Sequence, residues 1–137
     1  MRYMIDTNIF IFACTNPNEL DANVTALLED CENTFIISTE SIREVVLLNK
    51  KGGINTKIWR SYADIRSSLK ERGIEIRHVG DKHLQKLFVL EPVRDHHDPA
   101  DLMIISQAIT ENIDLISSDK EFEKYMPQGL KFIRNHR

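Results

Sequence analysis

The sequence contains no apolar run long enough to cross a membrane. A spanning helix needs about 20 predominantly apolar residues, whereas the most apolar stretches here, such as Leu102–Ile105, soon meet polar residues. The N-terminus also lacks the basic segment and long apolar stretch of a secretory signal peptide. We therefore expect a cytoplasmic protein that does not associate with membranes.

Cysteine is scarce, and positive charge is not in excess. The chain has 2 cysteines, Cys14 and Cys31, and no Cys-x-x-Cys motif, which is typical of reduced thiols rather than of a disulfide framework. Its 18 basic residues against 21 acidic ones give a net charge of −3, which excludes a generally basic nucleic-acid coat. A nucleic-acid substrate is still allowed, because carboxylates that hold a divalent cation present positive charge to phosphate.

Repeats, low-complexity segments and linkers are also missing from the sequence. With 137 residues, 42% of them apolar and 28% charged, the chain is large enough to bury a core of its own. We expect residues 1–137 to form a single domain. The pair Gly52-Gly53 is the only candidate hinge, and we expect it to join two helices.

Short apolar segments alternate with helical patterns along the whole chain. Strands are predicted at residues 2–5, 34–38, 74–79, 113–116 and 130–133. Helices are predicted from residue 9 to the Asn16-Pro17-Asn18 stop, and over residues 20–31, 38–50, 54–72, 81–90, 99–111 and 119–125. This alternation predicts an α/β fold with a mostly parallel sheet.

Acidic residues follow the predicted strands. Asp6 comes directly after the first strand, Asp119 comes shortly after residues 113–116, and Glu44 lies in the helix that follows residues 34–38. Asp98 and Asp101 begin the apolar helix 99–111. Since ligands of parallel sheets bind beyond the carboxyl ends of the strands, these acids are expected to converge at one edge of the sheet.

Each acid also has a local explanation as a helix cap. Asp98 precedes Pro99 as an N-cap would, Ser41-x-x-Glu44 matches a capping box, and Asp6 and Asp119 stand where helices begin. Capping accounts for each acid separately, but it gives no reason for several of them to gather at one edge.

Two observations favour a shared site over separate caps. On a helical projection Glu44 falls between Leu47 and Leu48, on an otherwise apolar face, where an unpaired carboxylate is costly. Gathered carboxylates also raise one another's pKa, and a hard divalent cation removes that penalty. Oxygen ligands suit Mg²⁺ or Mn²⁺. Such ions can activate water against a phosphodiester, so no nucleophilic side chain is required.

The motifs together resemble the PIN-domain family, and within it the VapC-type toxins of toxin–antitoxin pairs. They are Asp6-Thr7-Asn8 after the first strand, an acid in the helix after the second strand, Asp-Pro-x-Asp before an apolar helix, and Ser-Ser-Asp after the next strand. The resemblance extends from Tyr3 to Ile133. It implies a three-layer α/β/α sandwich with about five strands, and Mg²⁺- or Mn²⁺-dependent cleavage of RNA.

The resemblance also implies roles for individual residues and partners. The metal-binding and catalytic acids would be Asp6, Glu44, Asp101 and Asp119, supported by Thr7 or Asn8, Ser118 and the N-cap Asp98. A homodimer and a small inhibitory antitoxin would be the protein partners.

The chain departs from the family pattern at several positions. Leu102 stands where many family toxins carry arginine. Trp59 and Tyr62 fall in the predicted helix 54–72, which we interpret first as packing on the core or a dimer mate and second as a substrate clamp. The loop histidines His96 and His97 stand beside the proposed site; we interpret them first as solvated and second as phosphate contacts. Basic side chains that could contact RNA are Lys50, Lys51, Lys57 and Arg60.

Three other functions fit parts of the pattern. An aspartate-dependent phosphatase would need a second acid two residues after Asp6, where Asn8 stands, and a receiver domain would need an acidic pair and a lysine that are not clearly present. A PIN-like module that binds RNA or a partner without turnover is the third, and the intact set of acids argues against it.

Overall fold

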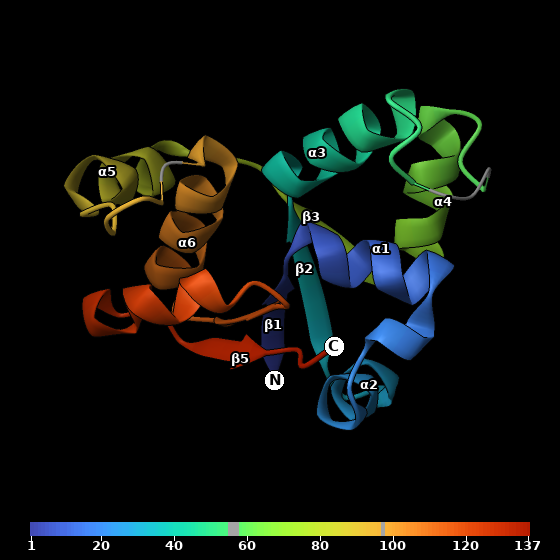
Figure 1. Ribbon diagram of the computed structural model, residues 1–137, viewed down its shortest axis with the longest axis horizontal. Coiled ribbons are helices and arrows are strands. Elements are labelled where there is room, and N and C mark those ends of the chain that lie inside the picture. Colours follow the sequence, from blue (N-terminus) through green and yellow to red (C-terminus); the bar gives the residue numbers. More distant parts are fainter. Residues whose placement is uncertain (55–57, 97) are drawn as a thin grey trace.

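A five-stranded sheet in which every pair of neighbours runs parallel forms the centre of the protein. The computed structural model describes residues 1–54, 58–96 and 98–137. The strands occur in the order β3-β2-β1-β4-β5 (Figure 1). Their bounds are β1 Arg2–Ile5, β2 Thr34–Ser38, β3 Ile74–Arg77, β4 Asp114–Ser117 and β5 Phe132–Arg134. The expected parallel sheet is confirmed.

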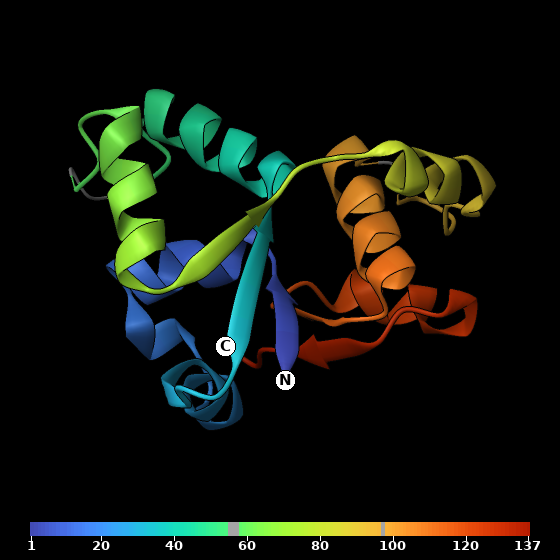
Figure 2. The ribbon, with the colours of Figure 1, turned by 180° about the vertical axis from the view of Figure 1, so that it is seen from behind.

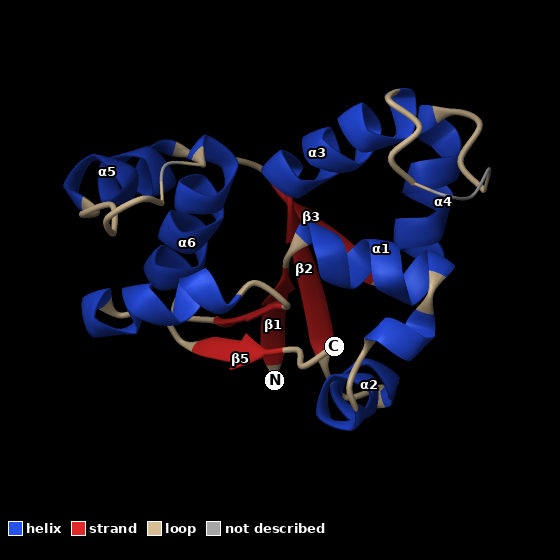
Figure 3. Cartoon of the chain, in the orientation of Figure 1, coloured by secondary structure: helices blue, strands red, loops and turns tan. Residues whose placement is uncertain are grey.

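Helices cover both faces of this sheet, as a three-layer α/β/α sandwich requires (Figures 1 and 3). One layer holds α1 Thr7–Thr15, the short 3₁₀ turn η1 Pro17–Glu19, α2 Ala22–Glu29, α3 Thr39–Lys50 and α4 Tyr62–Glu71. The other holds α5 Asp81–Val89, α6 Pro99–Glu111 and the 3₁₀ helix η2 Lys120–Gln128. Within the described residues, no helix has both the length and the apolar character to cross a membrane.

Alternation along the central strands divides the core into two clusters. Tyr3 and Ile5 of β1 pack with Phe10 against the layer of α1 to α4. Met4, between them, points to the other face and packs with Ile104 of α6. Strands buried on both faces read as nearly continuous apolar runs, which is why β1 and β2 were recognisable in the sequence.

The predicted helix 54–72 is wrong at residues 54 and 58–61, which are described and are not helical. Helix α4 begins at Tyr62, and Ser61 caps it by accepting a hydrogen bond from the Asp64 amide. Residues 55–57, including Lys57, lie outside the described part of the chain. Trp59 therefore precedes the helix. It is 3% exposed, and its ring stacks on Phe10 with centroids 5.4 Å apart.

The two C-terminal elements also differ in detail from the prediction. Residues 119–125 were expected to form a short helix, but the segment is the longer 3₁₀ helix η2, with Pro127 inside it. The final strand β5 lies at the edge of the sheet, as expected, and begins at Phe132.

The connections bring four segments to the same edge of the sheet. Helices α1 and α3 and the helix η2 follow the carboxyl ends of β1, β2 and β4. After β3 the chain passes through α5, and α6 then runs back toward the start of β4 (Figure 2). The N-terminus of α6 consequently lies at the edge where the other three begin.

Trp59 gives a direct test of the assignment of this residue to the core, where it stacks on Phe10. We expect Trp59→Ala to lower the free energy of unfolding by about 3–5 kcal/mol, because it removes a large buried aromatic side chain. Its neighbour Ile58 is 45% exposed, so Ile58→Ala serves as the matched control and should change stability by less than about 1 kcal/mol. Urea unfolding followed by circular dichroism measures both, and equal effects of the two variants would contradict the assignment.

Candidate metal centre

A cavity of about 240 Å³ lies at the carboxyl edge of the sheet and is rich in carboxylates. Its lining consists of Asp6, Thr7, Asn8, Ile11, Glu44, Leu48, Asp98, Asp101 and Asp119. The four acids expected to bind metal thus meet in one cavity, although they come from the β1–α1 connection, α3, α6 and the β4–η2 connection. The fifth acid of the sequence analysis, Asp98, lies in the same lining.

Asp6 is the most buried of these acids, with 4% exposure. It caps α1, since its Oδ1 accepts a hydrogen bond from the Thr7 amide at 2.8 Å. Its Oδ2 accepts two more, from Ser117 Oγ at 2.7 Å and from Asn8 Nδ2 at 3.2 Å. Asp6 is therefore a helix cap and a cavity carboxylate at once, and neither interpretation excludes the other.

Burial makes Asp6 and Asp101 hard to ionise in the metal-free protein. The pKa of Asp6 is raised to about 7, mainly by burial and also by the charges of Asp101 and Glu44, while the hydrogen bonds from Ser117 and Thr7 lower it. Burial likewise raises the pKa of Asp101 to about 6, while its hydrogen bond to His96 acts in the other direction.

Glu44 is half-buried and is held by a short contact with Thr7, whose Oγ1 donates to Glu44 Oε1 at 2.6 Å. The capping-box interpretation of Ser41-x-x-Glu44 is wrong, because the N-cap of α3 is Ser38, which accepts from the Glu40 amide. Glu44 shares the cavity lining with Leu48, whereas Leu47 is 46% exposed.

Asp98 and Asp101 separate into two environments. Asp98 is exposed and caps α6 by accepting from the amides of Ala100 and Asp101 at 2.9 and 3.3 Å. Asp101 is half-buried. Asp101, Asp119 and His96 each offer one atom that could bind a metal, and these three atoms lie within 4.8 Å of one another. The cap expected for Asp98 is present.

The serine that supports this cluster is Ser117, not the expected Ser118. Besides its bond to Asp6, Ser117 Oγ accepts from the Asp119 amide at 3.0 Å. The Ser118 Oγ instead accepts a hydrogen bond from Asn135 Nδ2 at 2.8 Å, and the Ser118 amide donates to Asn8 Oδ1. The strand register could have identified Ser117, because Ile5 lies opposite Ile116 and the next residues of β1 and β4 are Asp6 and Ser117.

His96 was expected to be solvated, and it is buried, with 8% exposure. Its ring lies between Tyr125 and Asp101, with Nδ1 3.0 Å from the Tyr125 hydroxyl and Nε2 3.0 Å from Asp101 Oδ2. The aromatic residues that enclose it, Phe122 and Tyr125, belong to η2, far along the chain. The sequence around His96 therefore gives no indication of its burial. His97 lies outside the described residues.

The remaining sequence candidates lie away from the cavity lining. Leu102 packs against the core cluster on the α6 face of the sheet. Lys50, Lys51 and Arg60 are exposed and Tyr62 is 53% exposed, and among the described residues none of them lines the carboxylate cavity.

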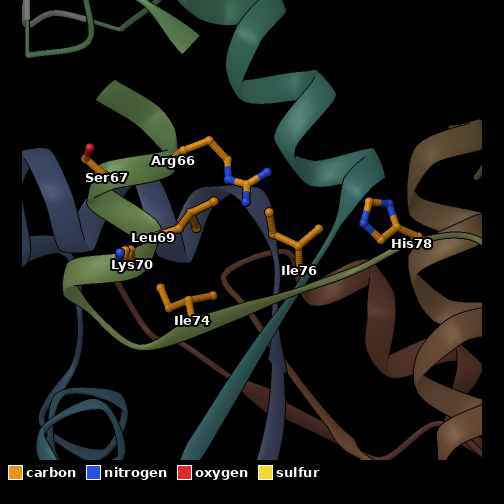
Figure 4. Close-up of a pocket in the computed structure, with 7 residues that line it drawn as sticks. All are labelled: Arg66, Ser67, Leu69, Lys70, Ile74, Ile76 and His78. Atoms are coloured by element: carbon orange, nitrogen blue, oxygen red, sulfur yellow. The ribbon is translucent and has the colours of Figure 1, made fainter. Parts of the chain in front are cut away.

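A second cavity, of about 390 Å³, has a different chemistry. It lies between α4 and β3 and is lined by Arg66, Ser67, Leu69, Lys70, Ile74, Ile76 and His78 (Figure 4). None of these described lining residues is acidic, so this cavity is unsuited to bind a cation.

The donor set of the carboxylate cavity fits a hard divalent cation. Carboxylate oxygens are the ligands that Mg²⁺ and Mn²⁺ prefer. A cation would also offset the burial and the mutual repulsion that raise the pKa values of Asp6 and Asp101.

Comparison with known proteins agrees with the fold. A family model described as "PIN domain" matches residues 3–126. The structure of VapBC2 from Rickettsia felis bound to a promoter DNA fragment is 25% identical, with 98% of each chain covered and a TM-score of 0.68. DNA-bound VapBC from Salmonella typhimurium is 17% identical, with 98% of each chain covered and a TM-score of 0.71.

A third solved structure is VapBC-5 from Mycobacterium tuberculosis, described as a member of the VapBC family of toxin-antitoxin systems. It is 19% identical, with 97% of this chain and 98% of that chain covered and a TM-score of 0.62. No curated protein sequence gives a significant match.

The raised pKa of Asp6 predicts how the metal-free protein responds to pH. The folded state binds this proton more tightly than the unfolded state, so its stabilising contribution is lost as the pH rises from 3.8 toward 7. We expect Asp6→Asn, which cannot ionise, to raise the melting temperature in EDTA by a few degrees at about pH 8, and by less at about pH 5. Thermal unfolding at both pH values measures the difference, and a variant that is less stable at the higher pH would contradict this account.

Proposed function

The chain belongs to the PIN-domain family, and from that premise we propose that it is a metal-dependent ribonuclease, the toxin of a toxin–antitoxin pair. The observation that carries the proposal is the meeting of Asp6, Glu44, Asp101 and Asp119 in one cavity of about 240 Å³. The family match over residues 3–126 also supports treating residues 1–137 as one nuclease domain.

Mg²⁺ or Mn²⁺ is the proposed cofactor, held by the four acids Asp6, Glu44, Asp101 and Asp119. When bound, such an ion supplies positive charge for a phosphodiester oxygen and lowers the pKa of bound water, so that water can serve as the nucleophile. The protein itself needs no nucleophilic serine, cysteine or histidine for this chemistry.

The surrounding polar residues act by holding the acids in place. Three donors, from Thr7, Ser117 and Asn8, fix both oxygens of Asp6 in one orientation. The Thr7 hydroxyl fixes Glu44 in the same way. Preorganised carboxylates cost little further ordering when a cation binds, and this favours a defined coordination geometry.

The residue two positions after Asp6 disfavours the phosphatase alternative. A phosphatase of this class would carry a second acid there, whereas this chain has Asn8, whose side chain bonds to Asp6 and to the Ser118 amide.

An RNA substrate and a small antitoxin are the proposed partners, together with a second copy of the chain in a homodimer. The antitoxin is supported by the similarity to VapBC structures, of which the one from Mycobacterium tuberculosis is described as a member of a toxin-antitoxin family. A binding module without turnover is the alternative, and the cleavage experiment below separates the two.

Two acids of α6 give a matched test of this function. We expect Asp101→Asn to lower Mg²⁺-dependent cleavage of total RNA by at least about 100-fold, because it removes a proposed ligand. Asp98→Ser keeps a capping side chain and should lower cleavage by less than about tenfold. The assay compares both variants with the wild type, with and without EDTA.

Three outcomes of that assay would contradict the proposal. Cleavage that persists in EDTA would show that the activity does not depend on a metal. Equal losses of cleavage in Asp101→Asn and Asp98→Ser would show that Asp101 is not distinguished from Asp98 as a metal ligand. RNA that binds tightly but is never cut would favour the alternative module.

A further inference from the structure

We propose that His96 is a positioning residue of the metal centre, which holds Asp101 in its metal-binding orientation through a hydrogen-bonded chain that starts at Tyr125. The inference rests on the proposed metal centre and extends it to two residues outside the set of carboxylates. The sequence predicts this role for neither residue, because His96 was expected to be solvated and Tyr125 lies about 30 positions away.

The ring of His96 is enclosed on several sides. It packs against Tyr125 at 5.4 Å and against Phe122 at 6.0 Å between ring centroids. Both aromatic residues are fully buried. A turn closed by a hydrogen bond from the His96 amide to the Val93 carbonyl sets the backbone, with Asp95 at a positive φ of 68°. The imidazole is thus confined to one orientation by its packing.

The hydrogen-bond partners of Tyr125 determine where the imidazole proton lies. The Tyr125 oxygen accepts from the Val93 amide at 3.0 Å, and its own proton then has His96 Nδ1 as an acceptor at 3.0 Å. A neutral imidazole that accepts at Nδ1 carries its proton on Nε2. This proton points at Asp101 Oδ2, 3.0 Å away.

The opposite tautomer is disfavoured by the same distances. With the proton on Nδ1, the lone pair of Nε2 would face a carboxylate oxygen at 3.0 Å with no proton between them. Two acceptors at hydrogen-bond distance repel each other, and the cost is high in a buried site. The first tautomer satisfies Val93, Tyr125, His96 and Asp101 together.

This arrangement makes His96 a supporting residue and not a metal ligand. One ring nitrogen of His96 lies within 4.8 Å of carboxylate oxygens of Asp101 and Asp119, but the lone pair of Nε2, the nitrogen bonded to Asp101, is occupied by the proton. Hydrogen-bond donors to metal-binding carboxylates orient the ligand, and removing one typically lowers metal affinity by about 10–100-fold.

Mn²⁺ affinity, measured by electron paramagnetic resonance on the full chain, tests this role independently of RNA cleavage. We expect His96→Ala to weaken Mn²⁺ binding by about 10–100-fold. His96→Gln should recover most of the affinity, since its amide can donate from nearly the position of Nε2. Tyr125→Phe should weaken Mn²⁺ binding several-fold, because it removes the hydroxyl that fixes the His96 tautomer but keeps the aromatic packing.

His83 provides the matched control within the same chain. It is 7% exposed, and its Nε2 lies 2.9 Å from the Glu111 carboxylate, a similar pair in a place that does not line the carboxylate cavity. His83→Ala should leave the Mn²⁺ affinity of the folded protein unchanged. Circular dichroism verifies the folding of each variant.

The possible results are distinguishable. Wild-type affinity in His96→Ala, or in Tyr125→Phe if the alanine variant does not fold, would overturn the positioning role. Nitrogen hyperfine coupling to Mn²⁺ that disappears in His96→Gln would overturn it too, by making His96 a ligand. A wild-type protein that binds no Mn²⁺ would overturn the metal centre itself, and the positioning role with it.

Discussion

The burial of Asp6 among other carboxylates is the constraint on which the rest of the site depends. Parallel strands deliver their carboxyl ends to one edge of a sheet, and here that edge gathers acids from four segments of the chain. Removing Asp6 from water costs free energy, and Asp101 and Glu44 add repulsion. These buried acids therefore lower the stability of the metal-free fold, and a bound cation can offset this loss.

Hydrogen bonds between different helices and strands hold the cluster of carboxylates in place. Ser117 connects β4 to Asp6 and to the Asp119 amide, while Asn8 connects α1 to the loop after β4. Behind them, Asn135 joins Ser118 to the Glu19 carbonyl and the Asp21 amide. These hydrogen bonds hold the carboxylates in fixed positions. A site that must present oxygens to a cation requires such positioning.

Sequence periodicity was sufficient for most of the fold, and the acids chosen from it line one cavity in the structure. Buried strands such as Thr34–Ser38 are short apolar runs, and acids that follow them can be assigned to one edge from topology alone. The supporting residues were harder to identify. The choice of Ser117 over Ser118 depends on strand register, and the burial of His96 depends on aromatic residues about 30 positions away. The start of α4 was missed because Trp59 is buried by stacking on Phe10, and not because it lies on the apolar face of a helix.

Anomalous scattering from crystals grown with Mn²⁺ is the sharpest test of the metal centre, because it locates the cation without reference to activity. We expect Mn²⁺ in the cavity, bound by oxygens of the four acids Asp6, Glu44, Asp101 and Asp119, with His96 Nε2 hydrogen-bonded to Asp101 and outside the coordination sphere. Carboxylates that remain unliganded while Mn²⁺ occupies another surface would contradict it.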